Sequence, residues 1–206
     1  MPCWSCERPE GDGAFCAKCG VILPPRGGRT HFDVIGIVEG YHLDADALEA
    51  GYKQLARKLH PDRFARADAR ARRFSLEHAT ALNEAYRTLR DPVRRAEYLL
   101  RVRGRIELDI DKTGAEGAAP KVDQAFLVEM MELQEALGEA RREGRAEEVE
   151  KIAADIRRRR EEELHAVGEE FASPGDGAYQ RIGRRLAHVR YFNRVLVDVT
   201  GREEAA

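Results

Sequence analysis

The chain has 206 residues, of which 35% are charged and 43% hydrophobic, and its 35 basic and 37 acidic residues leave a net charge of −2. This balance argues against a protein that coats nucleic acid, which needs a strong positive charge. The length favours one to three small domains, and the absence of a long apolar run excludes a membrane-spanning helix. The first residues carry neither a basic stretch nor an apolar run, so we expect no signal peptide and a cytoplasmic protein.

Two cysteine pairs of the form C-x2-C, separated by nine residues, stand at the start of the chain. Such pairs wrap a metal ion from both sides in a tetrahedral four-thiolate site. A segment of this size buries too little apolar surface to fold alone, so the metal supplies the missing stability. We therefore predict a small zinc-ribbon-like module at residues 1–28, with a hairpin turn at 11–13. Its structural zinc ligands are Cys3, Cys6, Cys16 and Cys19.

Three other interpretations of the cysteines stay open: iron in a rubredoxin-like site, two disulfide bonds, and thiol redox chemistry. Disulfide bonds are disfavoured in a cytosolic chain. A redox pair needs only one C-x2-C, at the end of a strand before a helix, and neither pair has that context. Because the cysteines complete the ligand set, we expect a closed site without His31 or His42 as ligands.

The next segment has the pattern of an amphipathic helix at residues 44–59. Asp44 is suited to cap its start, and Pro61 disfavours helical geometry at His60, where the helix should end. The apolar stripe consists of Leu48, Tyr52, Leu55 and Leu59. The opposite side is basic and carries Lys53, Arg57 and Lys58.

A polar loop at 60–63 leads into a second predicted helix, at 68–90. Asp91 and Pro92 should end that helix and begin a short third one, which continues through residue 99. The two long helices make a helical hairpin, and an apolar segment at 32–37 predicts a short helix packed across it. The second helix should bury Phe74, Leu82, Ala85 and Leu89.

A basic helix, a His-Pro-Asp loop and a second long helix together resemble the J-domain of DnaJ-type co-chaperones. The run LNEAYRTLRDPVRRAEYLL at 82–100 is similar to the J-domain end of HscB, the co-chaperone of iron–sulfur cluster assembly. The resemblance implies a J-domain at residues 30–105 that engages a DnaK- or HscA-type chaperone and triggers its ATP hydrolysis. It implies chaperone contacts by Lys53, Arg57, Lys58, His60, Pro61, Asp62 and Arg63, the last standing where the family usually has Lys.

Plainer interpretations of the same residues exist. A basic helix face is often only a solvated face, and a His-Pro-Asp tripeptide alone can be an ordinary turn. A catalytic role for His60 and Asp62 is disfavoured, because no nucleophile, metal site or glycine-rich phosphate loop accompanies them. We therefore expect a protein that is not itself an enzyme.

The C-terminal part predicts an antiparallel three-helix bundle at 121–200, after a linker at 106–120. Its helices cover about 121–143, about 145–171, and the segment after a turn at 173–177. One stripe of the first helix is apolar and should face the core: Phe126, Met130, Leu133 and Leu137. A second apolar face edged by carboxylates suggests a partner surface.

The run FLVEMMELQEAL at 126–137 is similar to the scaffold-binding helix of HscB. The family's Met is replaced by Val128 and its Phe by Tyr191, both of which remain bulky and largely apolar. The alternative is that these side chains pack against the J-domain or complete the bundle core. The resemblance implies contacts with the iron–sulfur scaffold IscU by Leu127, Val128, Met131, Glu132, Glu135 and Tyr191.

The sequence thus predicts a mainly α-helical, three-part co-chaperone, and the family resemblance covers about three-quarters of it. Its partners should be the chaperone and the scaffold, with neither nucleic acid nor membrane. One alternative is a general J-domain protein whose bundle binds another client. A zinc-ribbon regulator that binds nucleic acid is disfavoured by the net charge and by the isolation of Arg8 and Lys18 in the cysteine module.

Overall fold

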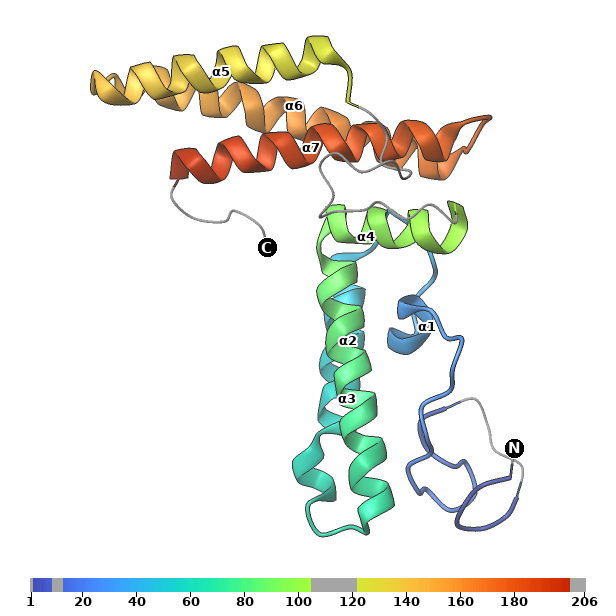
Figure 1. Ribbon diagram of the computed structural model, residues 1–206. Coiled ribbons are helices and arrows are strands. Elements are labelled where there is room, and N and C mark those ends of the chain that lie inside the picture. Colours follow the sequence, from blue (N-terminus) through green and yellow to red (C-terminus); the bar gives the residue numbers. More distant parts are fainter. Residues whose placement is uncertain (1, 9–12, 105–121, 201–206) are drawn as a thin grey trace. The chain divides into compact units, whose positions relative to one another are not determined.

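The computed structural model describes residues 2–8, 13–104 and 122–200, and this part of the chain is mainly α-helical, as predicted (Figure 1). Its contacts form two compact units: unit 1 comprises the described residues within 1–39 and 43–90, and unit 2 comprises those within 40–42 and 91–206. The predicted linker at 106–120 and most of the predicted turn at 11–13 lie outside the described residues. In the described part, no helix is long and apolar enough to cross a membrane.

Unit 1 begins with the small cysteine-containing module. Its core consists of buried Cys3, Cys16 and Leu23, against which Trp4 and other half-buried side chains pack. The Leu23 N–H donates a hydrogen bond to the Ala14 carbonyl at 2.8 Å, so the segment after residue 13 folds back on itself as a short hairpin. The hydrophobic core of this module is therefore built around sulfur atoms rather than around a layer of aliphatic side chains.

Three helices complete unit 1, and each begins or ends at a local signal. Helix α1 (His31–Ile35) has a capping box between Thr30 and Asp33. Helix α2 (Ala45–Leu59) is capped by the Asp44 carboxylate and ends at His60, as predicted. A 3₁₀ turn (Pro61–Phe64) leads into helix α3 (Ala69–Arg90), which lies beside α2 in Figure 1. The predicted helical hairpin is therefore confirmed.

The packing of this hairpin matches the predicted stripe of α3 and differs from that of α2 at two positions. The four α3 residues that we expected to be buried are all buried, and Leu48 and Leu59 of α2 are buried too. Leu55, on the same α2 stripe, is only half-buried, and so is Tyr52. Its ring stacks on Tyr86 at 4.1 Å, and its hydroxyl donates to Asn83 Oδ1 at 3.0 Å. This edge of the hairpin is therefore aromatic and polar.

Unit 2 contains helix α4 (Pro92–Leu99), a π-helical turn (Leu100–Gly104), and the long helices α5 (Gln124–Arg142), α6 (Ala146–Ala172) and α7 (Ala178–Thr200). Short turns join α5 to α6 and α6 to α7, so successive helices run antiparallel, which confirms the predicted bundle (Figure 1). Helix α5 starts three residues later than predicted, because the Asp123 side chain caps it by accepting the Phe126 N–H.

The core of the bundle takes side chains from all three long helices. Met130 and Leu137 of α5 are buried as predicted, whereas Phe126 and Leu133 on the same stripe are half-buried. Helix α4 packs on α6 and α7 and therefore belongs to unit 2. Residues 40–42 belong here as well, since the Tyr41 ring stacks on that of Phe171 at 5.6 Å.

Candidate functional site

The two C-x2-C turns of the module have the same backbone geometry. The N–H that follows each pair, from Glu7 and from Gly20, donates to the carbonyl of the first cysteine, Cys3 or Cys16, at 2.9 Å in both turns. In both turns the first cysteine also donates its own N–H to the carbonyl five residues further on, at 2.8 Å. Glu7 and Gly20 both have positive φ values, of 61° and 73°. Two equivalent turns thus present their sulfur atoms to a common centre.

The four sulfur atoms of these turns all lie within 4.8 Å of one another. Cys3 Sγ is 3.8 Å from Cys19 Sγ, and Cys6 Sγ is 3.8 Å from Cys16 Sγ. A disulfide bond requires about 2.0 Å, so neither of these pairs is bonded. Four sulfurs placed about 2.3 Å from a central ion, at the corners of a tetrahedron, are about 3.8 Å apart. The donor set therefore fits a four-thiolate metal ion, as the cysteine spacing predicts.

The surroundings of the sulfur atoms shift the pKa values of Cys16 and Cys6 in opposite directions. Backbone N–H groups of Cys19 and Lys18 donate to Cys16 Sγ and lower its pKa to about 6. A similar bond from Arg8 lowers the pKa of Cys6, but burial and the three neighbouring thiols outweigh it and raise that pKa to about 11. Four thiolates packed this closely repel one another unless a cation lies between them. A bound divalent metal ion removes that repulsion.

The module packs on the first half of α3. The Trp4 ring meets Phe74 edge to face, with centroids 6.4 Å apart, and the Arg70 guanidinium lies 5.2 Å from the centroid of the indole. His78 Nε2 lies 2.9 Å from the Leu23 carbonyl oxygen. Burial lowers the pKa of His78, so the neutral ring donates this hydrogen bond. Sequence reasoning missed this contact, although a polar residue on the buried stripe of α3 was a signal for it.

The His-Pro-Asp loop is exposed at the end of α2. The side chains of His60 and Asp62 are 57% and 90% exposed, and Arg63 is also exposed. Within the loop, the Asp62 N–H donates to His60 Nδ1 at 3.3 Å, which orients the imidazole ring. Pro61 occupies the first position of the 3₁₀ turn. The loop thus presents an imidazole and a carboxylate to solvent from a fixed backbone.

The basic side chains predicted to contact a chaperone lie on the exposed side of α2. Arg57 and Lys58 are both exposed in its last turn. Lys53 is exposed as well, and its Nζ lies 2.6 Å from a carboxylate oxygen of Glu49, which raises the pKa of Lys53. An acidic partner that binds Lys53 must therefore compete with Glu49.

The predicted scaffold face lies on the outer side of α5. Val128 and Met131 are 47% and 61% exposed, whereas Met130, which lies between them in the sequence, is buried. Glu132 and Glu135 are exposed beside them. Large apolar side chains that are this exposed are few in the described part of the chain, and two of them share this face. The arrangement offers an apolar centre with a carboxylate border.

Tyr191 packs against the core-facing stripe of α5 rather than on its outer face. The ring is half-buried on α7 and meets Phe126 of α5 edge to face, with centroids 5.8 Å apart. Phe126 also stacks on His188 at 4.1 Å. Half-buried Leu127 follows Phe126 in the chain. The six predicted residues therefore lie on two helices, with Tyr191 where α7 meets the N-terminal half of α5.

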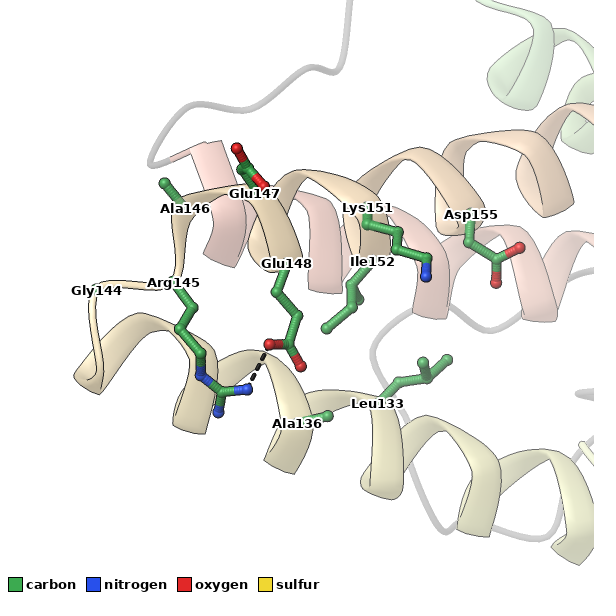
Figure 2. Close-up of a pocket in the computed structure, with 10 residues that line it drawn as sticks. All are labelled: Leu133, Ala136, Gly144, Arg145, Ala146, Glu147, Glu148, Lys151, Ile152 and Asp155. Atoms are coloured by element: carbon green, nitrogen blue, oxygen red, sulfur yellow. Dashed lines mark hydrogen bonds and ion pairs between the residues drawn. The ribbon is translucent and has the colours of Figure 1, made fainter.

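A groove that sequence reasoning did not identify runs between α5 and α6 (Figure 2). Leu133 and Ala136 of α5 face Ile152 of α6 across it, and Arg145 pairs with Glu148 at one end. None of the predicted site residues lines the groove. It is therefore separate from the outer face of α5.

Comparison with known proteins gives two family matches: the DnaJ domain at residues 30–98 and the HSCB C-terminal oligomerisation domain at residues 122–200. The mouse iron–sulfur cluster co-chaperone protein HscB is 34% identical over 197 residues, which cover 94% of this chain and 79% of the mouse protein. The chain belongs to the HscB co-chaperone family.

Other HscB proteins show the same relationship. The HscB homologue of Burkholderia multivorans is 34% identical over 175 residues, covering 85% of this chain and 94% of its own length. The crystal structure of human HscB superposes with a TM-score of 0.81 at 29% identity, and the match covers 97% of this chain and 96% of the human one. The expected J-domain and HscB C-terminal domain are thus both present, and the family is one of co-chaperones rather than of classical enzymes.

Proposed function

We propose that this protein stimulates the ATPase of a DnaK- or HscA-type chaperone and delivers an IscU-type iron–sulfur scaffold to it. One observation carries the proposal: a chain of the HscB family exposes a His-Pro-Asp loop after a basic helix and, on α5, an apolar face with a carboxylate border. The proposed domains are the metal module at 1–28, the J-domain at 30–105, a linker at 106–120 and the scaffold-binding bundle at 121–200.

The chaperone contact combines long-range electrostatic attraction with specific contacts made by the loop. Basic side chains on α2 attract an acidic surface and increase the association rate. The exposed loop then supplies the directional contacts, because Pro61 fixes the backbone from which His60 and Asp62 project. The proposed chaperone-binding residues are Lys53, Arg57, Lys58, His60, Pro61, Asp62 and Arg63.

The scaffold contact has an apolar centre and a charged border. Exposed Val128 and Met131 lose contact with water when a partner covers them, which favours binding. The carboxylates that flank them select a partner with basic groups around an apolar patch. The proposed scaffold-binding residues are Leu127, Val128, Met131, Glu132, Glu135 and Tyr191.

Holding both partners on one chain raises the concentration of scaffold near the chaperone and couples ATP hydrolysis to that client. The protein itself performs no covalent step; it shifts the conformational equilibrium of the chaperone. We propose that it acts in the cytoplasm and binds neither nucleic acid nor membrane. Zinc held by Cys3, Cys6, Cys16 and Cys19 would be structural, because four thiolates leave no open coordination position.

The test is the steady-state ATPase rate of the purified chaperone with this protein added, with and without purified IscU. We expect the rate to rise with the protein and to rise further with IscU, and we expect His60→Gln to abolish both effects. His165→Gln is the matched control, because this histidine is also exposed but lies on α6. If no DnaK-type chaperone responds, the proposal is wrong.

A second pair of variants separates the scaffold from another client. Met131→Asp should weaken IscU binding, measured by calorimetry, while the stimulation by the protein alone is retained. Leu76→Asp is the control, since Leu76 is 59% exposed, close to the 61% of Met131, but lies on α3. Stimulation that ignores IscU in the unmodified protein would indicate a J-domain protein for a different client.

A further inference from the structure

Two polar side chains are buried in the described part of the chain, Ser75 and His78, and they lie three residues apart on α3. Positions three apart on a helix are neighbours on its surface. Buried polar groups destabilise a fold unless they are hydrogen-bonded, so each of these side chains has a partner to satisfy. Their partners lie on two different elements.

The partner of His78 is the cysteine module. Its ring bonds to the carbonyl of Leu23, whose side chain is 1% exposed and belongs to the core that contains Cys3. One turn earlier on α3, Phe74 packs against Trp4, which stands between the first two cysteines. The Trp4 Nε1–H donates to the Ile22 carbonyl at 2.8 Å and thereby joins the two halves of the module. Its fold is therefore needed to make the surface that α3 contacts.

The partner of Ser75 is the end of α2. Its hydroxyl donates a hydrogen bond of 2.7 Å to the carbonyl of Leu59. Leu59 is the last residue of α2 and directly precedes His60. Carbonyls in the last turn of a helix lack a partner within the helix, so the Ser75 hydroxyl satisfies one that would otherwise be unpaired and buried. Ser75 thus fixes the backbone from which the His-Pro-Asp loop begins.

We propose that the cysteine module is a brace for α3, and that metal bound there holds the His-Pro-Asp loop in position through Ser75. Without metal, a module this small loses its fold and with it the Trp4 and Leu23 contacts to α3. The first half of α3 then opens locally more often, and the bond between Ser75 and Leu59 is made less of the time. The proposal rests on the proposed function for the role of the loop.

Hydrogen exchange of the full chain tests the brace without any partner protein. The reduced protein is compared after loading with Zn²⁺ and after treatment with EDTA and a phosphine reductant. We expect zinc removal to speed amide exchange about tenfold in residues 59–64 and in the first half of α3, with α6 and α7 unchanged. Faster exchange confined to residues 2–23 would overturn the proposal, because the module would then unfold without affecting the loop.

Substitution of Ser75 removes the contact between α3 and the end of α2. Ser75→Ala should keep its zinc and the fluorescence of Trp4, the single tryptophan of the chain, while its loop exchanges fast with or without zinc. Thr80→Ala, at an exposed position of the same helix, is the control and should behave like the unmodified protein. If Ser75→Ala retains a zinc-dependent loop, Ser75 is not the connection.

Substitutions of His78 test the contact between α3 and the cysteine module. His78→Leu removes the donor to Leu23 and should make loop exchange fast even with zinc bound. His78→Gln keeps an N–H donor of similar reach and should restore the slow exchange. A difference between these two variants separates a hydrogen-bonding role from loss of packing alone, and equal behaviour would contradict the brace.

The ATPase assay on the same samples separates this proposal from the proposed function. If exchange responds to zinc but no chaperone is stimulated, the brace stands and the proposed function fails. If exchange responds while stimulation is equal with and without zinc, the brace does not act on the loop's function, and that part of the proposal is overturned.

Discussion

The two ends of the chain are stabilised by different means. The core of the cysteine module consists of Cys3, Cys16 and Leu23, whereas that of the C-terminal bundle takes buried aliphatic and aromatic side chains from three long helices. A short segment cannot bury enough apolar surface to offset its loss of conformational entropy, while three packed helices can. The module is thus built around four clustered cysteines, and the bundle is built around apolar packing.

Their polar groups differ in the same way. Next to the module, Ser75 and His78 are buried and neutral, and each makes a single hydrogen bond. In the bundle, Glu163 lies on the flank of the core, 2.8 Å from His188 Nδ1 and 2.6 Å from an Arg185 nitrogen. Ion pairs at partly exposed positions cost less desolvation than buried ones. The bundle therefore pairs charges at the flank of its core, whereas the two buried polar side chains of α3 are neutral.

The largest expected effect is loss of the metal. Cys16→Ser should lower the zinc content from one per chain and unfold the module, because structural zinc supplies roughly 10–16 kcal/mol in isolated zinc-finger peptides. Metal analysis and hydrogen exchange measure the two effects. Ser5→Ala in the first C-x2-C turn is the control, and helices α5 to α7 should be unaffected.

A core deletion should break the bundle without changing the metal. Leu186 is fully buried on α7, and Leu186→Ala should lower the free energy of unfolding by about 2–5 kcal/mol through lost burial and a cavity. Denaturant unfolding followed by circular dichroism measures this loss. Met131→Ala, at an exposed position, should change it by less than about 0.5 kcal/mol. Equal losses of unfolding free energy in the two variants would mean that the face of α5 that carries Met131 is buried.

A smaller effect distinguishes the two C-x2-C turns. Glu7 occupies with φ 61° the position that Gly20 occupies with φ 73° in the second turn. Left-handed backbone costs a non-glycine residue about 1–2 kcal/mol, so Glu7→Gly should stabilise the module and Gly20→Ala should destabilise it. Competition with a zinc chelator measures both. Equal zinc affinities in the two variants would show that the turns do not share this geometry.

The smallest effects are those of pH, and they should differ between the two units. Burial holds the pKa of His78 below its ordinary 6.5, so the folded state binds fewer protons than the unfolded state, and unit 1 loses stability as pH falls through 6.5. Glu163 has a lowered pKa for another reason: burial raises it, but hydrogen bonds from His188 and Arg185 outweigh the burial. The stability that it contributes to unit 2 is lost only as pH falls below its ordinary 4.5.

Hydrogen exchange at a series of pH values, corrected for the intrinsic rate, separates these windows. His78→Gln should remove part of the pH dependence of α3 below pH 6.5, and Glu163→Gln should remove part of that of α6 and α7 below pH 4.5. A variant that leaves the profile of its unit unchanged would contradict the corresponding assignment.

Helix limits in this chain were predictable because their signals are local. The carboxylates of Asp44 and Asp91 cap N–H groups within three residues, and Pro61 stops α2 at His60 by its own ring. The helix start that differs most from its prediction, at Gln124, is set by the Asp123 carboxylate, a capping signal that the sequence interpretation did not use.

The contacts that join these elements were not predictable in the same way. Trp4 and His78 contact residues that are far away in the sequence, Phe74 and Leu23. The residues next to Trp4 or His78 in the sequence do not indicate which residue each will contact. Tyr52 was placed on an apolar stripe, yet it is half-buried because its ring stacks on Tyr86 at the edge of the hairpin. The position of Tyr191 likewise depends on how α7 packs on α5.

The order of these elements along the chain has a consequence during synthesis. The last cysteine is residue 19 and α3 ends at residue 90, so 71 residues separate the complete ligand set from the complete helix. At about 5–20 residues per second, a ribosome needs roughly 4 to 14 seconds to add them. A nascent chain that takes up its metal in this interval offers α3 a finished surface. Under the proposed brace, the Trp4 and Leu23 contacts are then available to α3 before the helix is complete.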